Sequence, residues 1–213
     1  GHSTFTNGWN PACLTPVTAG GTGGECLEEL ADEVMTDRES QEPDGYLNTY
    51  FSINAPTKKW TNLVEGHELY TAGHMIEAAV AYYQATGKEK FLNIARKNAD
   101  LICRVFGTGE GQKRGYPGHQ EIELALVKLY RVTGERAYLH QAEYFIRERG
   151  RNPNYLQAEI EGRGHPEFFP EFERYDLEYS QAHKPPVEQD EAVGHAVREM
   201  YMVLRNGRSC RGK

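Results

Sequence analysis

The chain has 213 residues, which suits one domain, and a formal net charge of −7 at pH 7. No cluster of Lys and Arg is present to neutralise phosphates, and no apolar run approaches the roughly 20 residues that span a bilayer. The four cysteines have no CxxC spacing, and the N-terminus lacks the pattern of a signal peptide. We therefore expect a cytoplasmic protein without nucleic-acid or membrane partners.

The first part of the chain carries few periodic signals. Residues 1–24 are rich in Gly, Thr and Pro, and we expect them to be irregular or disordered. Apolar residues at helical spacing predict a helix over 25–38. The Pro-Asp-Gly at 43–45 predicts a turn, and the aromatic and β-branched residues that follow, up to Phe51, predict a short extended segment.

The middle of the chain is clearly helical. Apolar stripes predict helices over 64–86, 91–106, 122–133 and 138–146. Thr-Gly pairs end the first and third of these, and Gly87 and Gly134 set a period of 47 residues (134 − 87). That period is typical of stacked αα-hairpins, in which one helix of each pair faces inward.

The last third predicts a long connection followed by one more helix. Residues 151–187 are aromatic and acidic with Pro and Gly breaks, and we expect Glu161–Glu178 to be a solvated loop. A helix over 188–203 is predicted to belong to the inward layer. Residues 204–213 are a poor continuation of it. Together these elements predict an all-α protein: αα-hairpin repeats that form a toroid or an arc of one.

The dipeptide Gly-His stands at the start of three predicted inward helices. The histidines are His67, His119 and His195. The positive end of a helix dipole favours the neutral imidazole, so these side chains are predicted to be neutral and to line a shared polar pocket. The alternative is that any one of these histidines is a solvated or helix-capping residue without a binding role.

Other candidate residues have two interpretations each. Tyr46 and Tyr116 either stack on a sugar or pack within loops. Paired carboxylates can act as acid and base, but Glu121 and Glu123 are more simply explained as first-turn caps or as partners of His119. His74 is expected to be a packing residue rather than a ligand.

Several segments of the chain resemble glycoside hydrolase family 127, the β-L-arabinofuranosidase type, from about residue 27 to residue 203. These segments are PDGYLNTYF at 43–51, HELYTAGH at 67–74, GYPGHQEIE at 115–123, SQAHKPPVEQ at 180–189 and AVGHAV at 192–197. The resemblance implies an (α/α)6 barrel, of which this chain carries an incomplete part over 25–203.

The resemblance also implies roles for the three histidines. His67, His119 and His195 match the histidines that contact the sugar in the −1 subsite, so an L-arabinofuranoside is the implied ligand. A zinc site made of the three imidazoles fits the residue types, but the resemblance assigns them to hydroxyl recognition instead.

The catalytic chemistry of the family has no counterpart among these residues. The family uses a zinc-held cysteine nucleophile, a glutamate acid/base and further Cys and Glu ligands, and we expect all of these to lie downstream of Lys213. Thus no catalytic residue and no cofactor are assigned in this chain. Residues 204–213 can be encoded by codons that, read one base later, give a sequence similar to the next segment of the family. The same holds less clearly for residues 3–9. These observations suggest the hypothesis that a frameshift truncated the protein.

Three functions follow as hypotheses. The first is a fragment of a β-L-arabinofuranosidase that keeps sugar contacts but is inactive alone. The second is a non-catalytic helical module that binds carbohydrate or a partner. The third, a sugar epimerase that uses the histidines as acid and base, is disfavoured because half of the ring is missing. A half-ring exposes apolar surface, so we expect the chain to self-associate, to be marginally stable or to need a partner that carries the missing half.

Overall fold

The structure is a computed structural model that describes residues 41–209, with side chains described up to residue 202. The expected irregular segment 1–24, the helix expected over 25–38 and the end of the tail at 210–213 lie outside the described residues. Within residues 41–209 every regular element is helical, and the β-structure is limited to one isolated bridge between Phe106 and Lys113.

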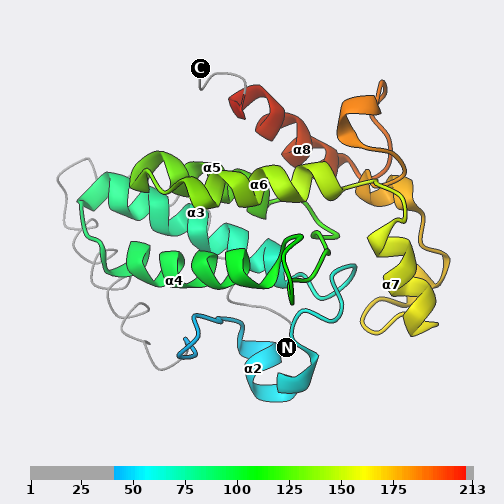
Figure 1. Cartoon of the computed structure of the whole chain (residues 1–213), viewed down its shortest axis with the longest axis horizontal. Helices are drawn as coiled ribbons and strands as arrows, with labels where there is room; N and C mark the ends of the chain where they lie inside the picture. The colour runs from blue at the N-terminus through cyan, green and yellow to red at the C-terminus, as the bar shows by residue number, and fades with distance from the viewer. Residues whose placement is uncertain (1–40, 210–213) are drawn as a thin grey trace, which may run out of the picture.

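The helices follow one another in two antiparallel pairs and a final single helix (Figure 1). The first pair is α3 (Glu68–Thr86) and α4 (Lys90–Val105), and the second is α5 (Ile122–Thr133) and α6 (Arg136–Glu148). The last helix is α8 (Ala196–Ser209). The shorter elements are α2 (Thr49–Asn54), α7 (Tyr155–Arg163) and the 3₁₀ turns η3 (Pro56–Lys58), η4 (Pro170–Arg174), η5 (Leu177–Ser180) and η6 (Pro186–Glu188).

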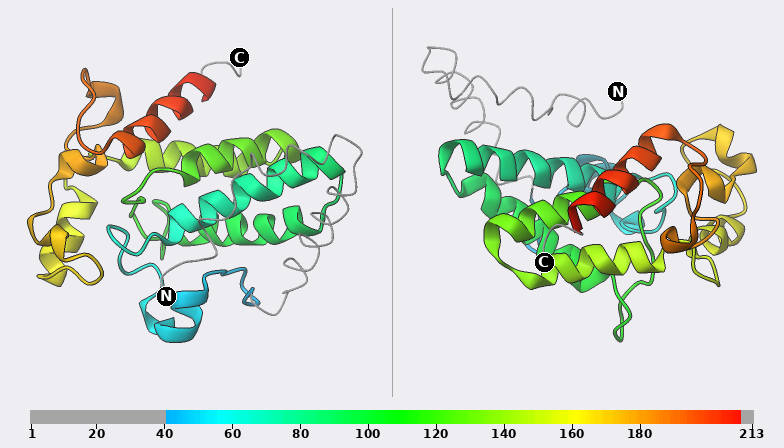
Figure 2. Two further views of the ribbon diagram at one scale, coloured as in Figure 1. Left: turned by 180° about the vertical axis from the view of Figure 1, so that it is seen from behind. Right: turned by 90° about the horizontal axis from the view of Figure 1, so that it is seen from above.

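The pairs are arranged in two layers. Helix α5 packs against α3, α6 and α8, whereas α4 packs against α3 and α6. Helices α3, α5 and α8 thus form one layer and α4 and α6 the other, and α8 crosses beside α5 at an angle to the rest (Figure 2). This is the αα-hairpin arrangement that the sequence predicts, an incomplete (α/α)6 toroid.

The repeat of 47 residues ends α3 and α5 in the same way. Gly87 and Gly134 both adopt φ 74°, and their N–H groups donate to the carbonyls of Tyr83 and Tyr130. Each preceding threonine donates its hydroxyl to the carbonyl four residues earlier, at 2.8 Å in both cases. The left-handed backbone suits glycine, which explains why the pair Thr-Gly recurs.

Apolar faces of these helices form one core. Ile76, Ala95, Ile102, Leu126 and Phe145 have essentially no exposed surface. The predicted stripes over 64–86, 91–106, 122–133 and 138–146 are therefore confirmed. Within residues 41–209, no helix combines the length and the apolar character that a membrane span requires.

Three sequence expectations about the connections are wrong. The segment up to Phe51 is not extended, because the Asn48 side chain accepts a hydrogen bond from Phe51 N at 3.2 Å and starts α2. The connection 151–187 contains a helix, α7, which Asn154 caps in the same way. The final helix begins at Ala196 rather than residue 188, and it continues through Ser209 instead of ending near residue 203.

The expectation of a solvated loop over Glu161–Glu178 is correct only in part. Phe168, Phe172 and Tyr175 from this segment pack against the core. The segment is attached to the loop before α3 by the Glu65 carboxylate, which accepts hydrogen bonds from the backbone N–H groups of residues 167–169 at 3.0–3.2 Å. Most acidic side chains of this stretch are exposed, as expected, whereas its aromatic rings are partly buried and attach it to the core.

Candidate functional site

Helices α3, α5 and α8 begin at the same end of the bundle (Figure 1). The three histidines lie together at this end. The ring centroids of His67 and His119 are 6.0 Å apart, and those of His119 and His195 are 6.3 Å apart. His67 is the N-cap of α3, and the carbonyl of His195 accepts the first helical bond of α8 from Glu199 N at 3.1 Å. His119 precedes the Glu121 N-cap of α5 by two residues, so only two of the three histidines stand directly at a helix start.

The glycine before each histidine is required by close backbone packing. A Cβ atom on Gly66 would lie 2.5 Å from the carbonyl oxygen of Asn62, and one on Gly118 would lie 2.6 Å from that of Leu63. At Gly194 the φ of +75° and an immediate clash with the Glu178 carbonyl exclude any side chain. Glycine thus permits a tight local turn before His67 and the close approach of a separate segment before His119 and before His195.

Backbone carbonyls fix two of the imidazole rings. The Nδ1 atom of His67 is 2.5 Å from the carbonyl oxygen of Glu65, and that of His119 is 2.8 Å from the carbonyl oxygen of Gln120. A carbonyl oxygen only accepts, so Nδ1 is the protonated nitrogen in both neutral rings. Each Nε2 atom then carries a lone pair that can accept a hydrogen bond from a ligand hydroxyl.

Burial keeps both of these rings neutral. Desolvation is the largest cause that lowers the pKa of His119, to about 3, and the nearby Arg198 guanidinium lowers it further. The pKa of His67 is lowered by the same two causes, with a partly opposing contribution from its backbone hydrogen bond to Glu65. Burial and the Arg198 cation therefore both favour the predicted neutral state of His67 and His119.

Arg198 is the central residue that the sequence analysis missed. Its guanidinium is buried, with Nη1 donating to the Gly118 carbonyl at 2.7 Å and to Ser180 Oγ at 2.6 Å. It also lies over the Tyr179 ring, 4.5 Å from the centroid. Arg198 therefore joins α8 to the loop that carries His119. Its position one turn after His195 was the only sequence signal, and it does not distinguish a buried arginine from an exposed one.

Aromatic side chains surround the three imidazoles. Tyr70 lies 4.2 Å from His119 between ring centroids, Phe169 lies 5.7 Å from His67, and Tyr179 lies 5.2 Å from His195. These rings give the polar group apolar walls, which is the usual composition of a small-molecule site. A small cavity at this place is lined by His67, Tyr70 and His119, among others, whereas His195 lies beside His119 but is not among the lining residues.

A buried carboxylate holds Phe169 in position. Glu65 accepts hydrogen bonds from the backbone N–H groups of residues 167–169 at 3.0–3.2 Å and pairs with Arg163 at 2.6 Å. The carbonyl of the same residue fixes His67. Glu65 thus connects residues 167–169 to the start of α3. The sequence around Glu65 gives no signal of this role.

Tyr46 and Tyr116 belong to the packing. Both are about 1% exposed. The Tyr46 hydroxyl donates to Glu68, and the Tyr116 hydroxyl donates to Asn154 Oδ1 at 3.1 Å. Of the two interpretations left open by the sequence, loop packing is therefore the correct one for both tyrosines.

The acidic residues before α5 divide into two environments. Glu123 caps the helix start, because its Oε2 accepts from Glu121 N at 3.2 Å, and its other oxygen lies 3.4 Å from Arg149 Nη2. Glu121 instead turns its carboxylate toward His74, with Oε1 3.5 Å from His74 Nδ1. The predicted capping role is thus confirmed for Glu123 but not for Glu121.

The described residues do not fit the cysteine-based zinc that the family resemblance implies. Cys103 is the cysteine among them, and its Sγ contacts the Ala137 carbonyl between α4 and α6, away from the histidines. Burial raises the pKa of its thiol to about 12, which opposes the thiolate that binds a metal. His67, His119 and His195 also do not form a three-ligand group within the part of the chain described here.

Comparison with known proteins assigns a family to this architecture. The model of the GH127 β-L-arabinofuranosidase catalytic domain matches residues 18–210. A non-reducing end β-L-arabinofuranosidase of Bifidobacterium longum subsp. longum is 41% identical over 167 residues, which are 76% of this chain and 25% of that enzyme.

Solved structures give the same result. The structure of a GH127 β-L-arabinofuranosidase from Geobacillus stearothermophilus T6 is 56% identical with a TM-score of 0.78, over 84% of this chain and 28% of that one. A second GH127 β-arabinofuranosidase is 45% identical with a TM-score of 0.69, over 85% of this chain and 27% of that one. The chain spans about a quarter of the length of these relatives. On this basis, the chain belongs to glycoside hydrolase family 127, the β-L-arabinofuranosidase family.

Proposed function

We propose that this chain forms part of the sugar-binding wall of a site for β-L-arabinofuranosides, with His67, His119 and His195 as the residues that contact the sugar. The observation that carries the proposal is the convergence of the three imidazoles, two of them neutral with Nδ1 bonded to a carbonyl. Sugar hydroxyls can donate to the Nε2 atoms of those two rings. The relatives' names, β-L-arabinofuranosidases, support this choice of sugar.

We further propose that the chain alone binds without cleaving. Neutral imidazoles with a depressed pKa are poor proton donors near pH 7, which argues against direct acid catalysis by His119. We propose that the nucleophile, the acid/base glutamate and the zinc ligands implied by the family resemblance are supplied by residues other than those described here. The low pKa of His119 also disfavours the alternative of an epimerase that uses these histidines as acid and base.

A binding titration tests the sugar-contact role. Saturation-transfer NMR with methyl β-L-arabinofuranoside should detect binding by the chain, and His67→Ala, His119→Ala and His195→Ala should each weaken it about tenfold, the loss expected for one or two hydrogen bonds. His140→Ala, an exposed histidine on α6, is the matched control and should bind as the parent does. Equal binding by all four variants would contradict the proposal.

An activity assay tests the second part. Purified chain should release no arabinose from p-nitrophenyl β-L-arabinofuranoside above the rate of the His119→Ala variant. Release by the parent chain that the variant lacks would refute the proposal that it is inactive alone.

The exposed face of α8 supports a proposed interaction surface as well. Val197 is 48% exposed and Met200 is 57% exposed, and both lie on the helix that ends the described inner layer. In an (α/α)6 toroid a further helix packs against this layer. We propose that, in the isolated chain, this face promotes self-association.

A further inference from the structure

Glu121 is a buried carboxylate with neither oxygen hydrogen-bonded in the structure. Its side chain has no exposed surface, and both Oε1 and Oε2 lack a hydrogen-bond donor. Helix α3 packs so tightly against its stem that a Cβ atom on Gly73 would lie 2.6 Å from Glu121 Cγ. Burial of an ionised carboxylate is costly unless the group is paired or coordinates a metal. The position of Glu121 therefore requires a positive partner or a bound proton.

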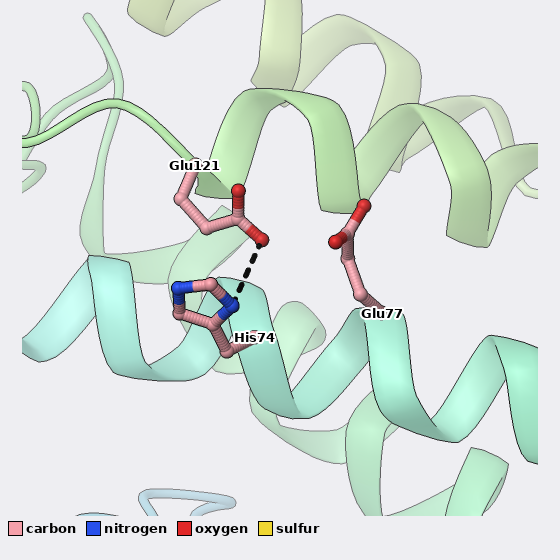
Figure 3. A group of neighbouring side chains, drawn as sticks. All are labelled: His74, Glu77 and Glu121. Atoms are coloured by element: carbon pink, nitrogen blue, oxygen red, sulfur yellow. Dashed lines mark ion pairs between the residues drawn. The ribbon is translucent and has the colours of Figure 1, made fainter. Parts of the chain in front are cut away.

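Two side chains of α3 face this carboxylate. His74 and Glu77, one helical turn apart, project from α3 toward Glu121 at the start of α5 (Figure 3). One ligand atom from each of the three residues lies within 4.8 Å of the other two, and the distance from His74 Nδ1 to Glu121 Oε1 is 3.5 Å. Ligands bound about 2.1 Å from one ion lie roughly 3–3.5 Å apart, so small side-chain rotations suffice to enclose a cation.

The charges around His74, Glu77 and Glu121 are compatible with a bound cation. Glu77 forms an ion pair with Lys128 of α5, which compensates one of the two carboxylates. The charge of Glu77 and, above all, burial raise the pKa of Glu121 to about 9. Burial lowers the pKa of His74, which favours a neutral ring with a free lone pair. The cluster therefore offers two carboxylates and one imidazole to either a shared proton or a metal ion.

We propose that His74, Glu77 and Glu121 bind a divalent transition-metal ion of the Zn²⁺ or Mn²⁺ class, through His74 Nδ1 and one oxygen from each carboxylate. An imidazole nitrogen with two carboxylate oxygens suits these ions better than Mg²⁺ or Ca²⁺, which prefer oxygen alone. Water completes the coordination. The ion joins α3 to the start of α5, two residues after His119, and so fixes the loop that carries this histidine.

Metal binding to the full chain is the direct test. Chain stripped with EDTA and kept in a non-chelating phosphine reductant is dialysed against Zn²⁺ or Mn²⁺, and bound metal is measured by mass spectrometry. We expect the parent to bind one ion per chain more than the Glu121→Gln variant does. The melting temperature should rise by about 5 °C or more at a hundredfold excess of metal over its Kd, and Mg²⁺ should give a smaller rise.

Variants decide whether the ion is at this cluster. Glu121→Gln keeps the shape of the side chain but removes its charge, and it should lose one bound ion per chain and the metal-induced rise in melting temperature. His74→Ala should do the same. The matched controls His140→Ala and Glu110→Gln, both at exposed positions, should bind and respond as the parent does.

Two results would overturn the proposal. One is the same stoichiometry and melting response in Glu121→Gln as in the parent, which would place the ion elsewhere. The other is no bound ion and no response in the parent, which would leave a carboxyl pair that shares a proton. Because Glu121→Gln matches the parent in shape, the test still applies if His74→Ala fails to fold.

Discussion

At the scale of single residues, His119 combines a ring fixed by a backbone carbonyl with a strongly lowered pKa. The folded chain holds the imidazole neutral down to about pH 3, whereas the unfolded chain protonates it near pH 6.5. The unfolded state therefore binds more protons below pH 6.5. Stability is present above that pH and is lost as the pH falls toward 3.

This predicts the behaviour of His119→Gln in acid. The parent should lose about 1–2 kcal/mol of its free energy of unfolding between pH 7 and pH 5 from this residue alone, allowing for its partial exposure. His119→Gln has no imidazole to titrate, so its loss should be smaller by that amount. Urea unfolding at the two pH values measures it, with His140→Gln as the control for removal of an imidazole. Parallel pH dependence in the parent and His119→Gln would contradict the assigned burial.

Glu121 has the opposite dependence on pH. Its pKa is raised from 4.5 to about 9 in the folded chain, so folding takes up a proton at neutral pH. The contribution of Glu121 to the free energy of unfolding is therefore most favourable below pH 4.5, and it decreases as the pH rises toward 9.

The Glu121→Gln variant should therefore be more stable than the parent in EDTA. We expect a gain of about 1–3 kcal/mol at pH 8 and little gain at pH 5, because the neutral amide has no ionisation to suppress. Chemical denaturation at both pH values measures the gain. Glu110→Gln, at an exposed position, should change neither value, and a variant less stable than the parent at pH 8 in EDTA would contradict the prediction.

At the scale of elements, the attachment of α8 depends on one glycine. Gly194 has φ +75°, and a Cβ there would clash with the Glu178 carbonyl. Gly87, at the end of α3, has nearly the same φ of +74° but open space around the position of a Cβ. The two glycines thus separate backbone strain from steric overlap.

Alanine at these two positions should have unequal effects. Gly87→Ala should cost about 1 kcal/mol, the strain of a left-handed alanine. Gly194→Ala should cost about 3 kcal/mol or more, because α8 must move away from Tyr179 and the loop beside it. Thermal unfolding measures both, and hydrogen exchange of α8 amides shows whether the helix detaches. An equal loss of unfolding free energy in the two variants would mean that the backbone at Gly194 moves to accept a Cβ atom at no energetic penalty.

The elements also show how far sequence patterns reach. The stripes of α3–α6 and the Thr-Gly ends were predictable, because helical periodicity and a left-handed C-terminal residue leave local signals. Helices α2 and α7 were not, because each depends on one asparagine cap and each buries few residues. The partial burial of Phe168 was missed for another reason: it arises from contacts with residues about a hundred positions away, such as Glu65 and Phe51.

At the scale of the whole molecule, the inner layer ends at a helix with an exposed apolar face. Val197 and Met200 lie on that face, while Met202 and Arg198 are buried on the other. Burial of the two exposed side chains between copies would be favourable by about 25 cal/mol per Å² of apolar area. The isolated chain should therefore self-associate.

Light scattering after size exclusion tests this expectation. The parent should elute as a dimer or larger species at tens of micromolar, and the double variant Val197→Lys with Met200→Glu should shift toward the monomer. Ile53→Glu replaces an apolar side chain that is 72% exposed on α2 and serves as the matched control. A parent that remains monomeric, or a control that dissociates as the double variant does, would contradict a role for this face.

The sequence by itself determined the helical hairpins, their period and the three Gly-His positions, because periodicity, caps and glycine requirements are local. The family resemblance, carried by short motifs, was also available from the sequence and is confirmed. Only the tertiary structure decided that the His119 imidazole lies about 6 Å from those of His67 and His195, that Arg198 is buried beside them, and that Glu121 faces His74 rather than capping α5. These depend on which helix faces meet and on how much water their packing excludes. Both are properties of the assembled chain, not of any one segment.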